Sequence, residues 1–347
     1  MNEKGLSKII ILIISVVVII GLASVTFFVV FQPPKEEWHL TVYAQGVEES
    51  WRAILEEFKK EHPQLKDYTL YVQSAGKISE RFLTEERTGK HIADVIVAET
   101  GVLEFSIKEG FLAYYEPPNA KSLMQYSFFS RYAKPGYYYP FRFLVQGIGI
   151  NTEYVDPALI SSYEDLTKPD IINKYKGRIG MADPRYTVAI ELYYFMNATY
   201  GHEFWERLSP LEPVLEPKST VAIEDLASGK IVILIGALGH LFSDTDKPVK
   251  FIYPKEGVVL TPVCAAISKN APNTNAAKEF VNWLFTKKAA ELLVKTRGGD
   301  PAYPGLALPG MKPVDQLLLV PQDYSKYHSV PSEKIIEDWA KTFKISG

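Results

Sequence analysis

The chain has 347 residues, of which 47% are hydrophobic and 23% are charged, and its net charge is −3 at pH 7. This mixture is typical of a globular protein and excludes a disordered, collagen-like or low-complexity chain. The negative net charge excludes an overall positive electrostatic field that would attract nucleic acid. The single cysteine, Cys264, excludes an intrachain disulfide and a cysteine-based zinc site.

The amino terminus carries a long apolar run with no charged residue from 9 to 31. As a helix it would extend about 34 Å at ~1.5 Å per residue, enough to cross a bilayer core of ~30 Å. We therefore predict a transmembrane anchor at 9–31, a cytoplasmic tip at 1–8 and a spacer at 32–37, with the large domain on the extracellular side of the cell membrane. Cleavage as a signal peptide is the alternative. Because no cysteine follows the run, an uncleaved anchor fits an archaeal surface better than a Gram-negative periplasm.

Strands and helices alternate along the first half of the outer domain. The segment Glu48–Glu61 is predicted to be a helix because Trp51, Ile54, Leu55 and Phe58 recur at helical spacing. The other elements predicted here are strands at 39–44, 68–73, 92–98 and 143–151 and helices at 77–88 and 101–108.

The alternation continues in the second half. Strands are predicted at 178–182, 231–236 and 258–267, and helices at 162–173, Thr187–Tyr200, 220–227, 275–296 (one helix or a pair) and 333–343. The helix Thr187–Tyr200 is apolar nearly all round and should be buried. This pattern predicts an α/β protein with parallel sheets covered by helices on both faces, and two such sheets fit the length. Ligands of such sheets bind beyond the carboxyl ends of the strands.

Several short stretches occur in an order that matches a known family. They are GKISER (76–81), ADV (93–95), GIGINT (147–152), SYEDL (162–166), YKGRIGMADP (175–184), LASGK (226–230), PKEG (254–257) and AAKEFVNWL (276–284). Taken together they cover roughly residues 40–300, and they resemble the extracellular solute-binding proteins of ABC importers. The chain is most similar to the branch with the type II periplasmic-binding-protein fold that includes the ferric-iron-binding proteins.

The resemblance implies two α/β lobes that are joined by extended crossings and close over a ligand by a hinge. It implies lobe 1 at 38–143 plus 252–300, lobe 2 at 144–251 and a C-terminal wrapping segment at 301–347. The implied function is the solute-binding component of an ABC importer, which captures a small molecule or ion and delivers it to a membrane permease. Such a protein needs no catalytic residue, cofactor or nucleic acid, and we expect a monomer.

Loops between a strand end and a helix start supply the candidate ligand-binding residues. Their free N–H groups and the positive end of the helix dipole favour an anion. The candidates from these loops are Gln45, Gly46, Ser74, Ala75, Gly76, Glu99 and Thr100 in the first lobe and Arg185, Tyr186, Thr187 and Gly236 in the second. Arg142 joins them because the related iron proteins place an arginine near the bound anion there. Taken singly, Ser74, Thr100 and Thr187 are better explained as ordinary helix N-caps, whereas the resemblance favours the loops taken together as a ligand site.

The sequence leaves the charge of the solute open. The helix-start loops and Arg185 favour an anion or a metal chelate, whereas Glu99 and Glu191 would suit a polyamine, thiamine or another cation. Iron-binding members of the family use two adjacent tyrosines, and the resemblance places that pair near Ala237 and Leu238, neither of which can bind a metal. A membrane-tethered ectoenzyme is the rival function, although the chain lacks the H-E-x-x-H and G-x-S-x-G motifs.

Overall fold

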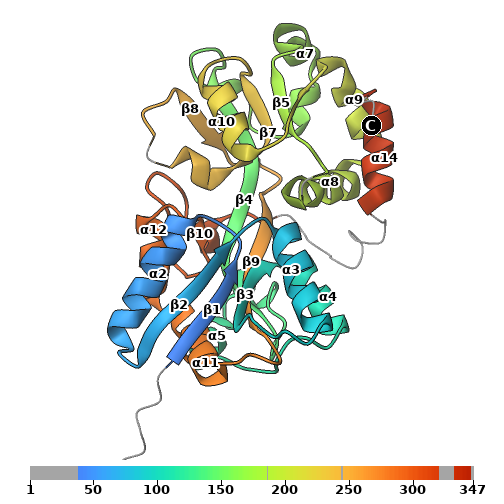
Figure 1. Cartoon of the computed structure of the whole chain (residues 1–347). Helices are drawn as coiled ribbons and strands as arrows, with labels where there is room; N and C mark the ends of the chain where they lie inside the picture. Colours follow the sequence, from blue (N-terminus) through green and yellow to red (C-terminus); the bar gives the residue numbers. More distant parts are fainter. Residues whose placement is uncertain (1–37, 186, 244, 320–331, 345–347) are drawn as a thin grey trace, which may run out of the picture.

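The computed structural model describes residues 38–185, 187–243, 245–319 and 332–344, which form two lobes connected by long strands (Figure 1). The predicted anchor at 9–31, with its tip and spacer, lies outside the described residues. Within the described part of the chain, no helix has the length and apolar character needed to cross a membrane.

One mixed sheet runs through both lobes, with the strand order β2-β1-β3-β9-β4-β7-β5-β6 and with β8 and β10 also paired to β4. Its strands are β1 (Trp38–Ala44), β2 (Leu65–Val72), β3 (Val95–Glu99), β4 (Tyr139–Asn151), β5 (Ile179–Ala182), β6 (Val214–Glu216), β7 (Ile233–Leu238), β8 (Val249–Ile252), β9 (Val259–Ile267) and β10 (Asp300–Pro301).

The prediction of two separate parallel sheets is wrong. The parallel sets β2-β1-β3 and β7-β5-β6 are joined by β9 and β4, which run antiparallel to their neighbours. The two parallel sets form one sheet because β4 is 13 residues long, buried throughout, and therefore long enough to pair with strands of both lobes. Its first half pairs with β9, and its second half pairs with β7 and β8 in the other lobe.

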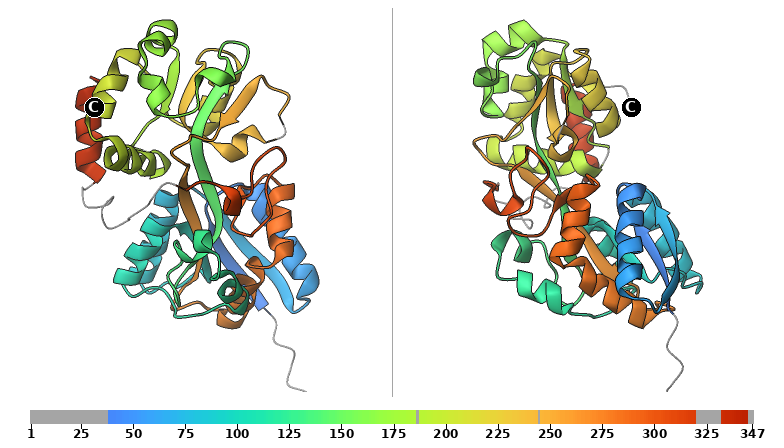
Figure 2. Two further views of the ribbon diagram at one scale, coloured as in Figure 1. Left: turned by 180° about the vertical axis from the view of Figure 1, so that it is seen from behind. Right: turned by 90° about the vertical axis from the view of Figure 1, so that its left-hand side faces the viewer.

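The helices of the first lobe cover both faces of its part of the sheet (Figures 1 and 2). They are α2 (Glu48–Glu61), α3 (Ala75–Arg87), α4 (Thr100–Lys108), α5 (Pro118–Leu123), α6 (Ser127–Ser130), α11 (Thr274–Leu284) and α12 (Lys287–Lys295). The apolar stripe predicted on Glu48–Glu61 is buried. The segment predicted as one helix or two is a pair, because the Thr286 side chain accepts a hydrogen bond from the Ala289 amide and starts α12.

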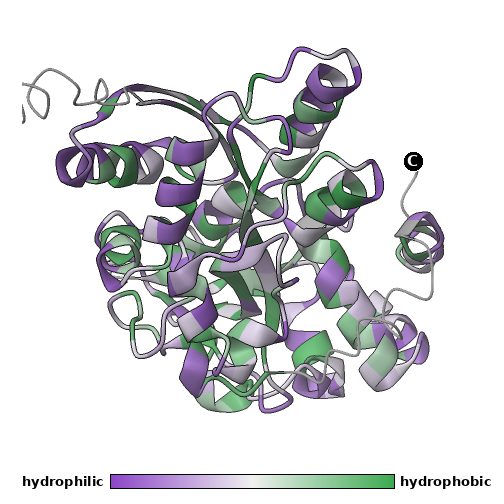
Figure 3. Ribbon diagram, turned by 90° about the horizontal axis from the view of Figure 1, so that it is seen from below, coloured by the Kyte–Doolittle hydropathy of each residue, from purple (hydrophilic) through white to green (hydrophobic). Residues whose placement is uncertain are grey.

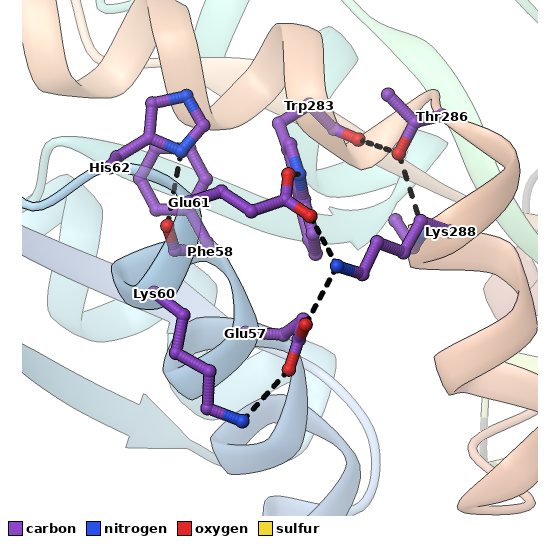
Figure 4. Close-up of polar contacts among 9 residues, drawn as sticks. Glu57, Phe58, Lys60, Glu61, His62, Trp283, Thr286 and Lys288 are labelled. Atoms are coloured by element: carbon purple, nitrogen blue, oxygen red, sulfur yellow. Dashed lines mark hydrogen bonds and ion pairs between the residues drawn. The ribbon is translucent and has the colours of Figure 1, made fainter.

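Polar contacts join α2 to the α11–α12 pair at the edge of this lobe (Figure 4). Lys288 forms ion pairs with both Glu57 and Glu61, and Trp283 donates its indole N–H to Glu61 at 2.7 Å. Beneath them the ring of Phe58 packs edge-on against Trp283. The hydrogen bonds of Lys288 and then of Lys60 lower the pKa of Glu57 to about 2.

The helical elements of the second lobe and of the C-terminal segment are η1 (Pro157–Leu159), η2 (Glu164–Thr167), α7 (Pro169–Tyr175), α8 (Thr187–Tyr200), α9 (Glu203–Leu208), η3 (Ser209–Leu211), α10 (Ser219–Ala227), η4 (Gly239–Phe242), η5 (Val314–Gln316) and α14 (Ser332–Thr342). The single helix predicted at 162–173 is wrong, since η2 and α7 are separate. Lys168 precedes Pro169 and adopts an extended backbone, which ends the first turn.

The helix α8 is buried between the sheet and α14, as its apolar sequence predicts. Its residues 192–196 are all buried, and Tyr193 stacks on Trp205 and meets Trp339 of α14 edge-on. Figure 2 shows α14 lying against the outer side of this lobe, next to α8 and α9. In Figure 3 the outer helices carry both hydrophilic and hydrophobic residues, as expected where only one face is buried.

The chain after β10 packs along the junction of the lobes before it reaches α14. Ala302 donates its amide to the Phe141 carbonyl at 3.0 Å, and the Ser243 hydroxyl donates to the Pro309 carbonyl at 2.9 Å. The amide of Lys312 then donates to the Tyr253 hydroxyl at 2.9 Å. The lobe boundaries at 38–143, 252–300, 144–251 and 301–347 stay a prediction.

Candidate ligand-binding site

A hollow of about 510 Å³ lies between the lobes, at the carboxyl ends of β1 and β2 on one side and of β5, β6 and β7 on the other. This is where an open α/β sheet places its ligands. The hollow is lined by Gln45, Gly46, Val47, Ser74, Arg142, Leu144, Ala182, Asp183, Ala189, Glu216, Pro217, Lys218, Ser219, Thr220, Ala222, Leu234, Gly236, Leu238, His240, Leu241 and Gly298. We call it the interlobe hollow.

Five of the residues predicted from the sequence line this hollow: Gln45, Gly46, Ser74, Arg142 and Gly236. They come from loops after β1 and β2, from β4 and from β7, which are far apart in the sequence. Four residues from the strand-end loops, Gln45, Gly46, Ser74 and Gly236, therefore come together at one place in the fold, together with Arg142. Whether these residues hold the solute stays a prediction.

The other first-lobe candidates lie beside the hollow. Ala75 and Gly76 begin α3, directly after Ser74. Glu99 is buried and accepts a hydrogen bond from Gln45 Nε2 at 2.6 Å, so it positions a lining residue. Thr100 lines a second hollow, described below.

In the second-lobe loop after β5, Asp183 lines the interlobe hollow, whereas the predicted residue Arg185 does not. Arg185 donates through Nε to both carboxylate oxygens of Asp183 at 2.9 Å, and it is Asp183 that lines the interlobe hollow. Tyr186 lies outside the described residues. Thr187 begins α8, and its side chain is likewise outside the description.

Arg142 is the buried cation of the hollow, with 3% of its surface exposed. Among the described residues, its guanidinium forms one hydrogen bond, from Nη2 to the Gln45 carbonyl at 3.2 Å, and no ion pair. Two glycines with positive φ make room for it. A Cβ on Gly46 would lie 3.0 Å from Nη2, and one on Gly299 would lie 2.8 Å from Nη1. Most of the five donors of the guanidinium therefore have no hydrogen-bond partner among the described residues.

Buried titratable groups surround Arg142. Burial lowers the pKa of Arg142 to about 10, partly offset by the charges of Glu99 and Asp300, so the guanidinium stays protonated at neutral pH. Burial raises the pKa of Asp300 to about 7. Burial, and then the nearby Arg142, lower the pKa of His240 to about 3, which keeps that imidazole neutral.

Asp183, Glu216 and His240 line the hollow but were not among the predicted residues. Asp183 and Glu216 stand where β5 and β6 end, so the strand-end rule applies to both. The strand β6 has only three residues and was not predicted, which hid Glu216. His240 follows β7 within the short η4 turn, and no sequence signal distinguishes it.

A second hollow of about 700 Å³ lies between α4, the chain before β4, and α8. Thr100, Glu104, Tyr138 and Glu191 are among its lining residues. Burial, and then repulsion by Glu99, raise the pKa of Glu191 to about 7. Glu104 forms an ion pair with Lys134 at 2.8 Å.

Comparison with known proteins gives a family match and several relatives. A family model described as "Bacterial extracellular solute-binding protein" matches residues 90–328. The "Spermidine/putrescine-binding periplasmic protein" of Salmonella typhimurium is 25% identical over 260 residues, which cover 71% of this chain and 72% of that protein. An uncharacterized Haemophilus influenzae protein is 25% identical over 217 residues, covering 58% of this chain and 62% of that protein, which is less than two thirds of its length.

Solved structures share the fold. The periplasmic binding protein AfuA from Actinobacillus pleuropneumoniae, with fructose-6-phosphate bound, superposes with a TM-score of 0.71 at 20% identity, covering 89% of this chain and 99% of that one. Iron-bound HitA from Pseudomonas aeruginosa gives a TM-score of 0.70 at 17% identity, covering 88% of this chain and 99% of that one. The predicted two-lobed periplasmic-binding-protein fold is thereby confirmed.

Proposed function

The chain belongs to the bacterial extracellular solute-binding proteins, and on that premise we propose that it captures a small anionic solute, or an anionic metal chelate, between its two lobes. As a solute-binding component of an ABC transporter, it works with a membrane permease. We propose further that it acts as a monomer and that closure of the lobes reports an occupied site to the permease.

The observation that carries the anionic assignment is the state of Arg142. A buried guanidinium is costly unless its charge and its donors are satisfied. Here it lines the interlobe hollow, and among the described residues it has one carbonyl partner and no ion pair. A carboxylate or phosphate would accept two parallel N–H bonds from it in the geometry that arginine favours.

A cationic solute is the second candidate, supported by the second hollow. Glu191 and Glu104 line that hollow together with the aromatic rings of Phe105 and Tyr138, and these groups suit an ammonium ion. Lys108 and Arg131 also line it and oppose a cation. The similarity to a relative named as a spermidine/putrescine-binding protein also supports this alternative. We place it second because Glu104 is already paired with Lys134.

We propose no direct metal site. Among the described residues, no group of three or more His, Cys, Asp or Glu side chains could hold a metal ion. Gly236, Ala237 and Leu238, near which the resemblance places a tyrosine pair, carry no metal-binding group. Iron would therefore enter as an anionic chelate, held through the oxygens of the chelator.

We propose that residues 9–31 anchor the protein to the cell membrane and that the two lobes act on the extracellular side. This rests on the uncharged apolar run and on Lys4 and Lys8, which precede it. Mass determination of the mature amino terminus tests it. A start near residue 25 or 32 would show cleavage instead.

A thermal-shift screen of the whole chain tests the solute class, with phosphate, sulfate, carboxylates, ferric citrate, putrescine and spermidine as probes. A ligand at about 100 times its dissociation constant stabilises the folded form by ~2.7 kcal/mol. For a protein of this size we expect a rise of roughly 5–10 °C in the melting midpoint. A rise with anions and none with amines supports the proposal, and the reverse result refutes the anionic assignment.

A further inference from the structure

A buried carboxylate lines the second-lobe side of the interlobe hollow, and one of its oxygens has no hydrogen-bond partner among the described residues. Glu216 ends β6 and is 3% exposed. Its Oε1 atom is buried and accepts no hydrogen bond, and no ion pair to Glu216 occurs in the described part of the chain. A polar side chain this deeply buried and this incompletely satisfied is uncommon, and it points to a missing donor.

The neighbouring charges do not supply that donor. Asp183, the other carboxylate of the hollow, is already compensated by Arg185. Lys230 forms an ion pair with Asp225. Lys218 lines the same hollow but is exposed, and it forms no ion pair with Glu216 among the described residues.

The energetics favour a charged donor over a neutral one. Burial raises the pKa of Glu216, the nearby Asp225 adds to the rise, and the charge of Lys230 offsets part of it. The ionised carboxylate is therefore destabilised where it stands, and a countercharge in contact with it would stabilise it. A hydroxyl would fill the hydrogen bond but leave the charge uncompensated, whereas an ammonium group supplies both.

We propose that the solute carries an ammonium group as well as its anionic group, and that Glu216 is the counter-ion of that ammonium. The inference rests on the proposed function, because Arg142 is taken to bind the anionic group. Arg142 and Glu216 line one hollow from different lobes, so a solute that contacts both would bridge the lobes. The substrate class is then a small zwitterion, with an amine and a phosphate, phosphonate or carboxylate on one short chain.

Calorimetric titration of the whole chain with matched probe pairs tests the inference. The first series pairs aminoalkyl phosphates of two, three and four methylenes with alkyl phosphates of the same lengths. The second pairs ω-amino carboxylates with carboxylates of the same lengths. We expect the amine to tighten binding at least tenfold for one length or more, and a hydroxyl in its place to gain less than threefold.

A Glu216→Gln variant, which keeps the shape and removes the charge, should reduce the amine-to-alkyl affinity ratio to within about twofold of one. A Glu203→Gln variant is the matched control, because Glu203 is an exposed carboxylate of α9 that does not line the hollow. It should keep the native ratio. The comparison on the native protein stands even if Glu216→Gln fails to fold.

The possible failures are distinguishable. If alkyl and aminoalkyl probes bind equally at every length, the ammonium site is refuted while the anionic assignment stands. If hydroxyl probes match the amines, Glu216 accepts from a neutral donor and the zwitterion is refuted. If neither series binds but putrescine does, the proposed anionic function is itself refuted.

Discussion

We expect the Arg142→Met variant to lose most of its anion affinity while it keeps nearly the native stability. The guanidinium is 3% exposed, and its one hydrogen bond among the described residues goes to the Gln45 carbonyl at 3.2 Å. That carbonyl also accepts from Trp51 Nε1 at 3.1 Å, so it keeps a partner after the substitution. Because Arg142 forms no ion pair among the described residues, its buried charge carries a desolvation cost that an apolar side chain of similar length does not have. We therefore expect the melting midpoint of Arg142→Met to change by less than about 4 °C.

The loss of binding should be much larger. An anion held by both arms of the guanidinium loses two charge-assisted hydrogen bonds, each contributing about 1.5–3 kcal/mol. The sum of about 3–6 kcal/mol corresponds to a loss of at least a hundredfold in affinity. The Arg142→Lys variant keeps the charge but lacks the planar guanidinium. Its anion affinity should lie between those of the native protein and Arg142→Met, about tenfold below the native value.

Isothermal titration with the anion that gives the largest thermal shift measures these losses, and thermal unfolding of the same samples checks the fold. A neutral probe of similar size serves as the control for non-specific binding. The reasoning is refuted if Arg142→Met binds the anion within threefold of the native affinity while its melting midpoint is unchanged.

Three further predictions concern pH, the C-terminal helix and the edge of the first lobe. Burial raises the pKa of Asp300 to about 7, so its carboxyl keeps its proton below pH 7 and loses it above pH 7. The affinity of the Arg142 site for an anion should therefore fall by up to about tenfold between pH 6 and pH 8. In calorimetry, the affinity of the Asp300→Asn variant should depend less on pH. Trp339→Ala removes a ring that is 1% exposed and packs on Tyr193, and it should reduce the free energy of unfolding by about 3–5 kcal/mol in denaturant titrations; a loss below 1 kcal/mol would mean that α14 is not part of the folded lobe. Lys288→Met removes the hydrogen bond that does most to lower the pKa of Glu57, so this pKa should rise from about 2 towards its ordinary value in an NMR titration, and no rise would contradict the contacts in Figure 4.

Local sequence patterns determined the helices well. Helical periodicity placed Glu48–Glu61 and Thr187–Tyr200 with the bounds that the structure has, because spacing and an all-round apolar surface are local properties. The order of short motifs identified the family. The strand-end rule led to four lining residues of the interlobe hollow, and the family resemblance supplied the fifth, Arg142. Short elements such as β6 lack enough residues to show a period, and these were missed.

Only the tertiary structure decided how the strands pair and what surrounds each charge. The long strand β4 joins the lobes into one sheet through pairings with β9 and β7, which lie about a hundred residues away in the chain. The same crossing buries Arg142 near Glu99 and Asp300. At the end of β6, the Oε1 atom of Glu216 is buried with no hydrogen-bond partner among the described residues. Burial and long-range pairing depend on contacts between distant segments, and these set the electrostatic character of the site. The sequence alone therefore determined the type of protein, whereas the fold decided which charges a solute would meet.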